Sequence, residues 1–454
     1  MAKKQYSVDM VNGSMFKNVI TFAIPLFFSN ILQLMYNAAD VIVVSRYSGS
    51  DAMASVGSTS SITNLMISLF TGLAVGGRVV VSRRFGARDD EGVHKAVHTS
   101  MLISVITGII SMIAGILFAK NLLMLMGTPE GKVLDGAVLY MKITFIGMLP
   151  NLVFNFGSSI LGAVGDTRRP LYILAFSGLV NVILNLILVI RFNMSVAGVA
   201  IATLISNVIS ATGVVITLVR TEGSYRLYPS KLRIYKSVFL DVLKVGIPTG
   251  IQSSLFGVSN TLIQSTVNSF GTAAIAGNSA ASNIDSFIYF STSAFGVAAV
   301  TGVSQNYGAK NEKGIKKAYK TCAVCAAFAG CLTGIISVIL AKPLLGIYIT
   351  DSAAAIDYGM VRLCVMGFTY FLCGIMEVQN GMIRGLGYST TTMITSLLGV
   401  CVFRVLWISF ILPLHRTTRT LYMCWPISWV LSIILNIICY SIIKKKAMQK
   451  MYES

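Results

Sequence analysis

The chain has 454 residues, of which 55% are hydrophobic and only 12% charged. Soluble domains usually carry about 25% charged residues, so this composition excludes a soluble globular protein, a disordered chain and a disulfide-rich secreted module. A membrane-spanning helix needs roughly 20 mostly apolar residues. We therefore expect an all-α polytopic membrane protein with little chain left for a soluble domain.

Apolar stretches recur along the whole length and predict twelve transmembrane helices. The expected spans are 18–45, 52–79, 96–119, 133–155, 168–190, 195–219, 239–268, 274–303, 318–341, 355–379, 389–413 and 419–443. Polar residues such as Asn, Gln, Ser and Thr interrupt several of these stretches without ending them. The number of spans is even, so both termini lie on the same side of the membrane.

Lys and Arg are distributed unevenly between the two sides of the membrane. With the N-terminus inside, the cytoplasmic segments hold 26 of them and the outer segments hold 9. Cytoplasmic loops of membrane proteins carry such an excess, so both termini are expected in the cytoplasm and the protein in the cell's inner membrane. The same distribution explains the net charge of +19 without a nucleic-acid partner.

An internal repeat divides the chain into two halves. The loop Val81–Gly92 recurs as Val303–Gly314 at an offset of 222 residues, and Gly165 pairs with Gly387 at the same offset. Each repeat carries six spans, so both halves enter the membrane in the same direction. We expect two six-helix lobes, residues 1–220 and 221–454, related by a pseudo-two-fold axis along the membrane normal, which is a common transporter plan.

Asp40 is the most suggestive charged residue inside the predicted spans. Charged side chains in hydrocarbon are costly and usually face a cavity or a partner. Gln33, Asn37 and Asp40 are spaced i, i+4, i+7 on one helix face, Tyr36 lies one turn before Asp40, and Pro25 is expected to bend the same helix. This group is able to hold a proton or a small cation; the alternative is a structural Asp bonded to a neighbouring helix.

Other polar residues within spans permit two interpretations each. Asn181 and Asn185 share a helix face, and Thr203 lies in the next span; they either join helices together or face Asp40. Asp285 and Glu377 either serve function or neutralise Arg404 as a buried pair. Glu377 corresponds to Asn155 in the first repeat. For His94 and His98, spaced i, i+4, a metal pair competes with simple solvation at the membrane interface.

Motifs of known chemistry are missing from the sequence. No Walker A, HExxH, nucleophile-elbow or dinucleotide-binding pattern occurs. The Gly-rich stretch from Gly72 to Gly77 lacks the following Lys-Ser or Lys-Thr of a phosphate loop and predicts close helix packing. We therefore expect no enzyme activity and no cofactor, with transport driven by an ion gradient or by the gradient of the cargo.

In this context the chain resembles the multidrug and toxic compound extrusion (MATE) family, in its bacterial form. The resemblance covers nearly the whole chain and depends on several motifs in order. They are Ile24-Pro25, Tyr36-Asn37 with Asp40, Gly49 with Ala54, Gly86-Ala87-Arg88, Leu161–Thr167, Gly198–Thr203, Gly308-Ala309-Lys310 and Arg384-Gly385-Leu386-Gly387. The resemblance implies the fold of this family and its superfamily (MOP), with export of organic cations or amphipathic drugs in exchange for H⁺ or Na⁺.

The resemblance also implies roles for particular residues. The ion-coupling site falls on Asp40, Asn181, Asn185 and Thr203, where Na⁺ is a possible ligand. Asn185 replaces an acid found in some members, which favours H⁺. Cargo contacts are expected from Tyr36, Asn37, Gln33, Asn155, Asp285 and Glu377. A second acidic site of the NorM type is in doubt, because its positions hold Phe256 and Cys373 here. The expected partners are small molecules and the lipid bilayer, and the expected state is a monomer.

Two other functions compete with drug antiport. A flippase for lipid-linked precursors would belong to the same superfamily, but only Arg404 is counted as a deep cation, whereas such flippases commonly have more. An uncoupled channel or receptor is the second alternative. The duplication and the isolated acid of the first span disfavour it.

Overall fold

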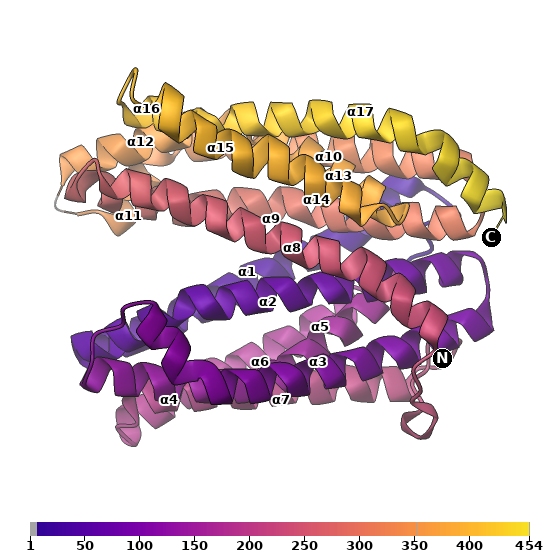
Figure 1. Ribbon diagram of the computed structural model, residues 1–454, viewed down its shortest axis with the longest axis horizontal. Coiled ribbons are helices and arrows are strands. Elements are labelled where there is room, and N and C mark those ends of the chain that lie inside the picture. The colour runs from indigo at the N-terminus through magenta and orange to yellow at the C-terminus, as the bar shows by residue number, and fades with distance from the viewer. Residues whose placement is uncertain (1–6, 351, 454) are drawn as a thin grey trace. The chain divides into compact units, whose positions relative to one another are not determined.

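The computed structural model describes residues 7–350 and 352–453, without the side chains of residues 49–51, and every regular element in it is helical. The chain forms two compact units (Figure 1), one of Met1–Val8 with Phe28–Gly250 and one of Asp9–Phe27 with Ile251–Ser454. These two units are defined by how densely the residues pack. The expected boundary between lobes near residue 220 is defined by the internal repeat instead, and it stays a prediction.

The first unit contains six helical segments besides its parts of two shared helices. They are α2 (Gly49–Gly86), α3 (Asp90–Leu125), α4 (Lys132–Ile146), α5 (Met148–Ala163), α6 (Arg168–Leu186), which continues as the π-helix η1 (Ile187–Arg191), and α7 (Ser195–Arg220). The short 3₁₀ turn η2 (Pro229–Lys231) follows in the same unit. The shared helices are α1 (Met15–Tyr47) and α8 (Lys236–Asn268).

The second unit contains the remaining helices. They are α9 (Thr272–Gly308), α10 (Glu312–Ile339), α11 (Ala341–Tyr348), α12 (Ala353–Gly367), α13 (Tyr370–Gly385), α14 (Ser389–Ser396), η3 (Leu397–Val402), α15 (Phe403–Leu406), η4 (Trp407–Ile411), α16 (Thr418–Tyr422) and α17 (Cys424–Glu453). The elements from α14 to η4 form one continuous span that alternates between α- and π-helical winding.

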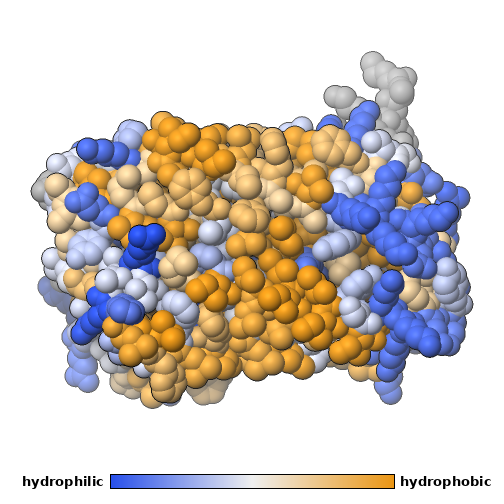
Figure 2. Space-filling model, turned by 90° about the horizontal axis from the view of Figure 1, so that it is seen from above, coloured by the Kyte–Doolittle hydropathy of each residue, from blue (hydrophilic) through white to orange (hydrophobic). Residues whose placement is uncertain are grey.

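The helices match the expected membrane spans. Nine helices of the described chain are long and apolar enough to cross a membrane, and the bent pairs α4–α5 and α12–α13 raise the number to 11. The remaining expected span, 239–268, coincides with the 33-residue helix α8, which has the length of a span but is more polar. Apolar side chains gather along the middle of the face in Figure 2 and hydrophilic ones towards its ends. The expectation of an all-helical polytopic membrane protein is confirmed.

Two spans expected to be continuous are bent. The bends are 40° between α4 and α5 and 50° between α12 and α13. In the first, Gly147 ends α4 and Pro150 occupies the first turn of α5, where proline is tolerated. In the second, the Thr369 hydroxyl donates to the Val365 carbonyl oxygen at 2.8 Å, a bond that often bends helices. Gly147 and Thr369 are related by the repeat offset.

The repeated loop folds in the same way in both halves. Arg88 and Lys310 have φ angles of 57° and 55°, in the left-handed region. The next residue caps the following helix in each case: Asp89 accepts from Gly92 N and Asn311 accepts from Gly314 N, both at 2.9 Å. A Cβ at Gly92 would lie 2.1 Å from the Asp89 carboxylate oxygen, so a larger residue here would displace the capping side chain.

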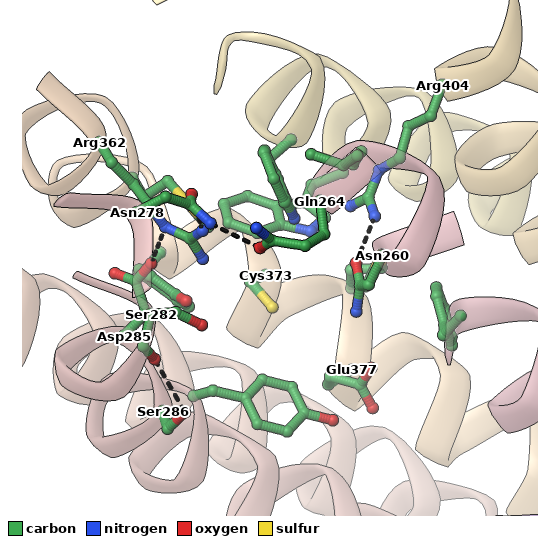
Figure 3. A pocket seen from close by; sticks show the side chains of 18 of the residues that line it. Asn260, Gln264, Asn278, Ser282, Asp285, Ser286, Arg362, Cys373, Glu377 and Arg404 are labelled. Carbon is green, nitrogen blue, oxygen red and sulfur yellow. Dashed lines mark hydrogen bonds and ion pairs between the residues drawn. The ribbon is translucent and has the colours of Figure 1, made fainter. Parts of the chain in front are cut away.

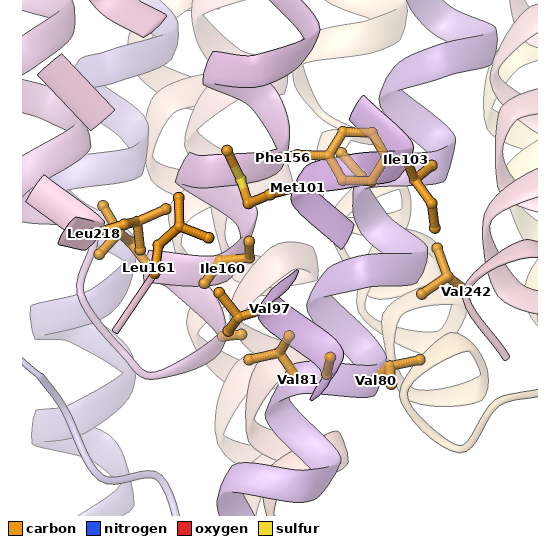
Figure 4. Packing of buried hydrophobic residues seen from close by; sticks show 14 of the residues in the cluster. Val80, Val81, Val97, Met101, Ile103, Phe156, Ile160, Leu161, Leu218 and Val242 are labelled. Atoms are coloured by element: carbon orange, nitrogen blue, oxygen red, sulfur yellow. The ribbon is translucent and has the colours of Figure 1, made fainter. Parts of the chain in front are cut away.

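Close helix contacts explain the glycine-rich stretch of α2. A Cβ at Gly72 would lie 2.1 Å from the Gly250 nitrogen, and one at Gly76 would lie 2.3 Å from the Val242 oxygen, both on α8. These glycines allow two backbones to meet within the first unit, as the sequence predicts. A buried apolar cluster that includes Val81 and Phe156 extends this packing (Figure 4).

Candidate ion and cargo sites

Asp40 lies in a network of hydrogen bonds that joins α1, α6 and α7 within the first unit. The Asn185 amide Nδ2 donates both to Asp40 Oδ1 and to Asn181 Oδ1, the latter at 3.2 Å. Asn181 Nδ2 donates to Thr203 Oγ1 at 3.3 Å, and the Thr203 hydroxyl donates to Asp40 Oδ2 at 3.3 Å. The four residues that the sequence analysis assigns to ion coupling therefore form one closed ring of hydrogen bonds.

Local helix geometry positions the amides of this ring. Asn181 and Asn185 lie one turn apart on α6 and are buried, whereas Asp40 is only half-buried. The helix changes to π-helical winding at Ile187, two residues after Asn185. π-Helical turns are rare and frequently occur at functional sites. The interpretation of the two Asn residues as mere helix joiners is incomplete, because both face the carboxylate ring.

The direction of these hydrogen bonds makes the network sensitive to the charge on Asp40. Followed from donor to acceptor, every series of hydrogen bonds in the ring ends at Asp40. This suits an ionised carboxylate, because that group only accepts hydrogen bonds. The Asn185 carbonyl oxygen Oδ1 is buried and has no hydrogen-bond partner in the described chain. A proton or a small cation bound at Asp40 would occupy one of its carboxylate oxygens, which then no longer accepts a hydrogen bond from the network. The bound proton or cation would itself need an oxygen partner, and rotation of the Asn185 amide would turn its free Oδ1 towards Asp40.

The other expected residues of α1 lie outside this ring. Tyr36 donates from its hydroxyl to the Ala175 carbonyl oxygen at 3.2 Å, and a Cβ at Gly178 would lie 1.8 Å from its ring. Tyr36 therefore packs α1 against α6. The side chains of Gln33 and Asn37 are exposed. Asp40 is the only one of the three residues on the predicted polar face that contacts the amides of α6.

Asn155 does not reach the Asp40 ring either. Its Nδ2 donates to the Asn151 carbonyl oxygen and to the Asn151 side-chain oxygen, both at 2.9 Å, within α5. Its expected role in cargo binding is neither tested nor supported by these contacts and stays a prediction.

A second polar site occupies the second unit. A cavity of about 390 Å³ is lined by side chains from α8, α9, α12, α13, α15 and α17. Figure 3 shows Asp285 and Arg362 on one side of it, Arg404 and Glu377 on the other, and Cys373 between them. Small-molecule sites commonly have volumes of about 300–1,000 Å³ and a few converging polar groups. This cavity has both properties.

Asp285 is paired, but not with Arg404, the partner considered in the sequence analysis as the alternative to a functional role. Its carboxylate accepts a hydrogen bond from Arg362 Nε at 2.7 Å. Arg362 also donates to Asn278 Oδ1 at 2.5 Å. Arg362 falls inside the expected span 355–379, but the sequence analysis does not name it among the intramembrane charges; it is buried in α12. Its position inside an apolar stretch was the available signal for an intramembrane charge.

Arg404 and Glu377 are not paired with each other. The Arg404 guanidinium donates to Ser428 Oγ at 3.3 Å and to Asn260 Oδ1 at 3.1 Å. In the described chain neither Arg404 nor Glu377 forms a salt bridge. Neutralisation of Arg404 by an acid, the main structural explanation for Glu377, is therefore absent from the described contacts.

The two histidines connect α3 to the following loop. Their rings stack with centroids 3.9 Å apart. The His98 Nδ1 lies 2.7 Å from the His94 carbonyl oxygen, and the Tyr228 backbone N–H donates to His98 Nε2 at 3.0 Å. These contacts occupy both ring nitrogens of His98, so they support packing between α3 and the loop over a metal pair.

Comparisons with known proteins give a consistent result. A family model described as MatE matches residues 25–187 and 248–408. The probable multidrug resistance protein YpnP of Bacillus subtilis (strain 168) is 26% identical over 396 residues, which cover 87% of this chain and 88% of that protein. The multidrug export protein MepA of Staphylococcus saprophyticus subsp. saprophyticus is 24% identical over 400 residues, 87% of each chain.

Solved structures share the fold. One is described as the outward-facing conformation of a multidrug resistance MATE family transporter of the MOP superfamily. It matches with a TM-score of 0.89 at 21% identity and covers 100% of both chains. At this level of identity the likeness concerns the arrangement of the helices.

Proposed function

Because this chain belongs to the MatE family, we propose that it exports organic cations or other amphipathic compounds in exchange for H⁺, with Na⁺ as the alternative coupling ion. The family consists of membrane transporters, so the chain is a multi-pass transport protein and not an enzyme, as the sequence predicts. Export, antiport and the identity of the ion are our proposals. The observation that carries them is the ring of hydrogen bonds around Asp40.

The ring links the charge on Asp40 to the packing of α1. While Asp40 is ionised, Asn185 and Thr203 bind its two oxygens and hold the second part of α1 against α6 and α7. Neutralisation of the carboxylate weakens both bonds. A hydrogen bond to a charged group contributes about 1.5–3 kcal/mol. Losing part of two such bonds is enough for a coupling free energy of about 1–3 kcal/mol between ion and cargo.

Pro25 supplies a position at which α1 is able to bend. It lies inside α1, where it removes one backbone hydrogen bond of the helix. In the proposed cycle, the ion binds Asp40 from outside, α1 changes its bend, and a cargo site of the first unit then binds cargo less well. By linkage, cargo must weaken ion binding by the same factor, which is the thermodynamic requirement for exchange.

The choice between H⁺ and Na⁺ depends on the oxygens around Asp40. The ring offers Na⁺ a single carboxylate, that of Asp40, with the neutral oxygens of Asn181, Asn185 and Thr203. A proton needs only one carboxylate and one acceptor. This supports H⁺.

One observation supports the flippase alternative and another opposes it. The cavity of the second unit contains two guanidinium groups, Arg362 and Arg404, where the sequence analysis counts one. However, Asp285 and Glu377 line the same cavity and bring its formal charge to zero. A cavity for a polyanionic lipid head group would be expected to have a positive excess, so drug export remains the function we propose.

Asp40→Asn tests the proposal in proteoliposomes. With an imposed ΔpH or ΔpNa and a fluorescent organic cation as cargo, the wild-type protein should transport and Asp40→Asn should lose gradient-driven transport. Asp135→Asn, an exposed position in the first turn of α4, is the matched control and should behave as wild type. Size-exclusion profiles establish that all proteins are folded. Undiminished transport by Asp40→Asn would refute the assignment.

We further propose that the protein is a monomer in the inner membrane with both termini in the cytoplasm. The excess of Lys and Arg in the assigned cytoplasmic segments supports this orientation. A C-terminal tag should then be reached by antibody only after the cytoplasmic side is opened, and accessibility in intact spheroplasts would contradict the orientation.

A further inference from the structure

The linker between α7 and α8, residues 221–235, is bonded to α3 within the first unit. The Tyr228 backbone N–H donates to His98 Nε2 at 3.0 Å. Further along the linker, the Thr99 hydroxyl donates to the Arg233 carbonyl oxygen at 3.3 Å and accepts a hydrogen bond from the Tyr235 backbone N–H at 3.2 Å. These bonds hold the linker at two places, so its exposed side chains are presented in a defined arrangement.

Three cations of the linker lie over tyrosine rings. The charged groups of Arg226 and Lys231 are 5.0 Å and 5.1 Å from the centre of the Tyr228 ring. The Arg233 guanidinium is 5.9 Å from the centre of the Tyr235 ring. A ring attracts a cation through its quadrupole but leaves the positive charge uncompensated. Among the described residues none of the three cations forms a salt bridge, so their charge is available to an anionic partner.

Other cations close to the start of α3 are paired with acids. Arg84 lies 3.2 Å from Asp89, and Lys95 lies 2.5 Å from Glu91. In contrast, residues 220–236 hold five cations and a single acid. The linker and its two flanking residues therefore carry a local excess of positive charge, whereas the preceding loop is close to neutral where its ion pairs form.

Two exposed aliphatic side chains alternate with the cations. Leu232 and Ile234 are 38% and 39% exposed. The backbone is extended at Leu232, and successive side chains of an extended chain point to opposite sides. The contact between Arg233 and the Tyr235 ring agrees with this geometry, because these residues are two positions apart. The segment 231–235 therefore has one apolar side and one side that carries cations.

The ends of two membrane helices place this linker at the edge of the bilayer. It begins after Arg220, the last residue of the apolar helix α7, and ends before Lys236, the first residue of α8. Segments with an apolar side and a basic side lie in the interface between lipid head groups and acyl chains. A soluble anion would satisfy only the cations, whereas a layer of anionic lipid offers phosphates and an apolar boundary together.

We propose that the linker docks onto anionic phospholipids of the leaflet that it adjoins. Leu232 and Ile234 then face the acyl chains, and the three cations lie at the level of the lipid phosphates. With the orientation proposed above, this is the cytoplasmic leaflet. One Lys or Arg near an anionic membrane surface strengthens binding about fivefold, so three cations are sufficient to select anionic over zwitterionic lipid. This inference goes beyond the proposed transport function and is independent of the coupling ion and the cargo.

Lipid titrations followed by native mass spectrometry test the charge selectivity. The full-length protein in neutral detergent should bind phosphatidylglycerol at least about tenfold more tightly than phosphatidylcholine with the same acyl chains. A variant that combines Arg226→Gln, Lys231→Gln and Arg233→Gln should lose about tenfold or more of the phosphatidylglycerol affinity, because each cation contributes about fivefold. Millimolar glycerol 3-phosphate should not displace the lipid. Full displacement would identify a site for soluble anions and overturn the inference.

A matched control removes the same charge at another place. Lys444→Gln, Lys445→Gln and Lys446→Gln together remove three exposed cations of α17 and should leave the phosphatidylglycerol affinity as in the wild type. An equal loss in both triple variants would show that net charge alone decides, which would overturn the inference. Arg226→Lys with Arg233→Lys keeps the charge and should retain the affinity. A loss as large as that of the glutamine variant would show a structural role instead.

Leu232→Trp tests the apolar side of the linker and does not depend on whether the triple variant folds. The protein has three native Trp residues, so the emission of the wild type is subtracted. In proteoliposomes with phosphatidylglycerol, the indole at position 232 should emit at shorter wavelength than an indole in water and be quenched by lipids brominated on their acyl chains. Emission typical of water without such quenching, from a protein with a wild-type size-exclusion profile, would overturn the inference.

Discussion

The buried pair of Asp285 and Arg362 allows a quantitative prediction about stability. Replacement of Asp285 by Asn leaves the Arg362 guanidinium buried without its carboxylate, and breaking such a pair from one side costs about 3–5 kcal/mol. Both side chains are at least nine-tenths buried and their atoms lie 2.7 Å apart, so solvent cannot compensate the remaining charge. We expect Asp285→Asn and Arg362→Gln each to lower the thermal unfolding midpoint in detergent by about 5 °C or more.

The double variant distinguishes the stability contributed by the interaction between Asp285 and Arg362 from the separate effect of each substitution. Asp285→Asn with Arg362→Gln removes both charges and keeps similar side-chain volumes, so it should recover most of the lost stability, because neutral replacements of buried pairs are often tolerated. Unfolding midpoints of the four proteins, measured by fluorescence-detected size exclusion after heating, form a double-mutant cycle. Additive losses in the double variant, or no loss in Asp285→Asn, would refute the reasoning.

The remaining predictions concern the first unit. Asn185→Asp adds a second carboxylate beside Asp40 and should increase ΔpNa-driven efflux relative to ΔpH-driven efflux in proteoliposomes; an unchanged ratio would show that this position does not influence ion choice. Gly178→Ala places a Cβ 1.8 Å from the Tyr36 ring and should lower the unfolding midpoint. Tyr36→Leu in the same background should restore part of it, and a stable Gly178→Ala protein would show that the contact gives way easily.

The sequence predicts the scaffold well because its signals are repetitive. Apolar stretches of span length and a loop repeated at a fixed offset are each visible without structural information. The bends at Gly147 and Thr369 are not visible in this way, because one lies at a glycine three residues before a proline and the other at Gly367 beside a single hydroxyl hydrogen bond. Thr is common in membrane helices, so its identity alone does not mark a bend.

The candidate sites are predicted only in part. Asp40, Asn181, Asn185 and Thr203, which the family resemblance names together, are joined by hydrogen bonds, and their role in ion coupling stays a prediction. Gln33 and Asn37 share a helical face with Asp40, but periodicity does not determine which neighbour a helix face contacts. In the second unit the sequence analysis considered only Arg404 as a partner for Asp285, because Arg362 was not included among the intramembrane charges.

The two bent spans have a consequence for how this fold has diverged. A glycine lies at each bend, since Gly147 follows the last residue of α4 and Gly367 is the last residue of α12, but the two glycines are not equivalent, because the repeat offset pairs Gly147 with Thr369. Both halves keep the bend although the residues beside it have changed places. Alignments of the two halves by residue identity therefore underestimate their kinship, and superposition of the helix axes is the more sensitive comparison.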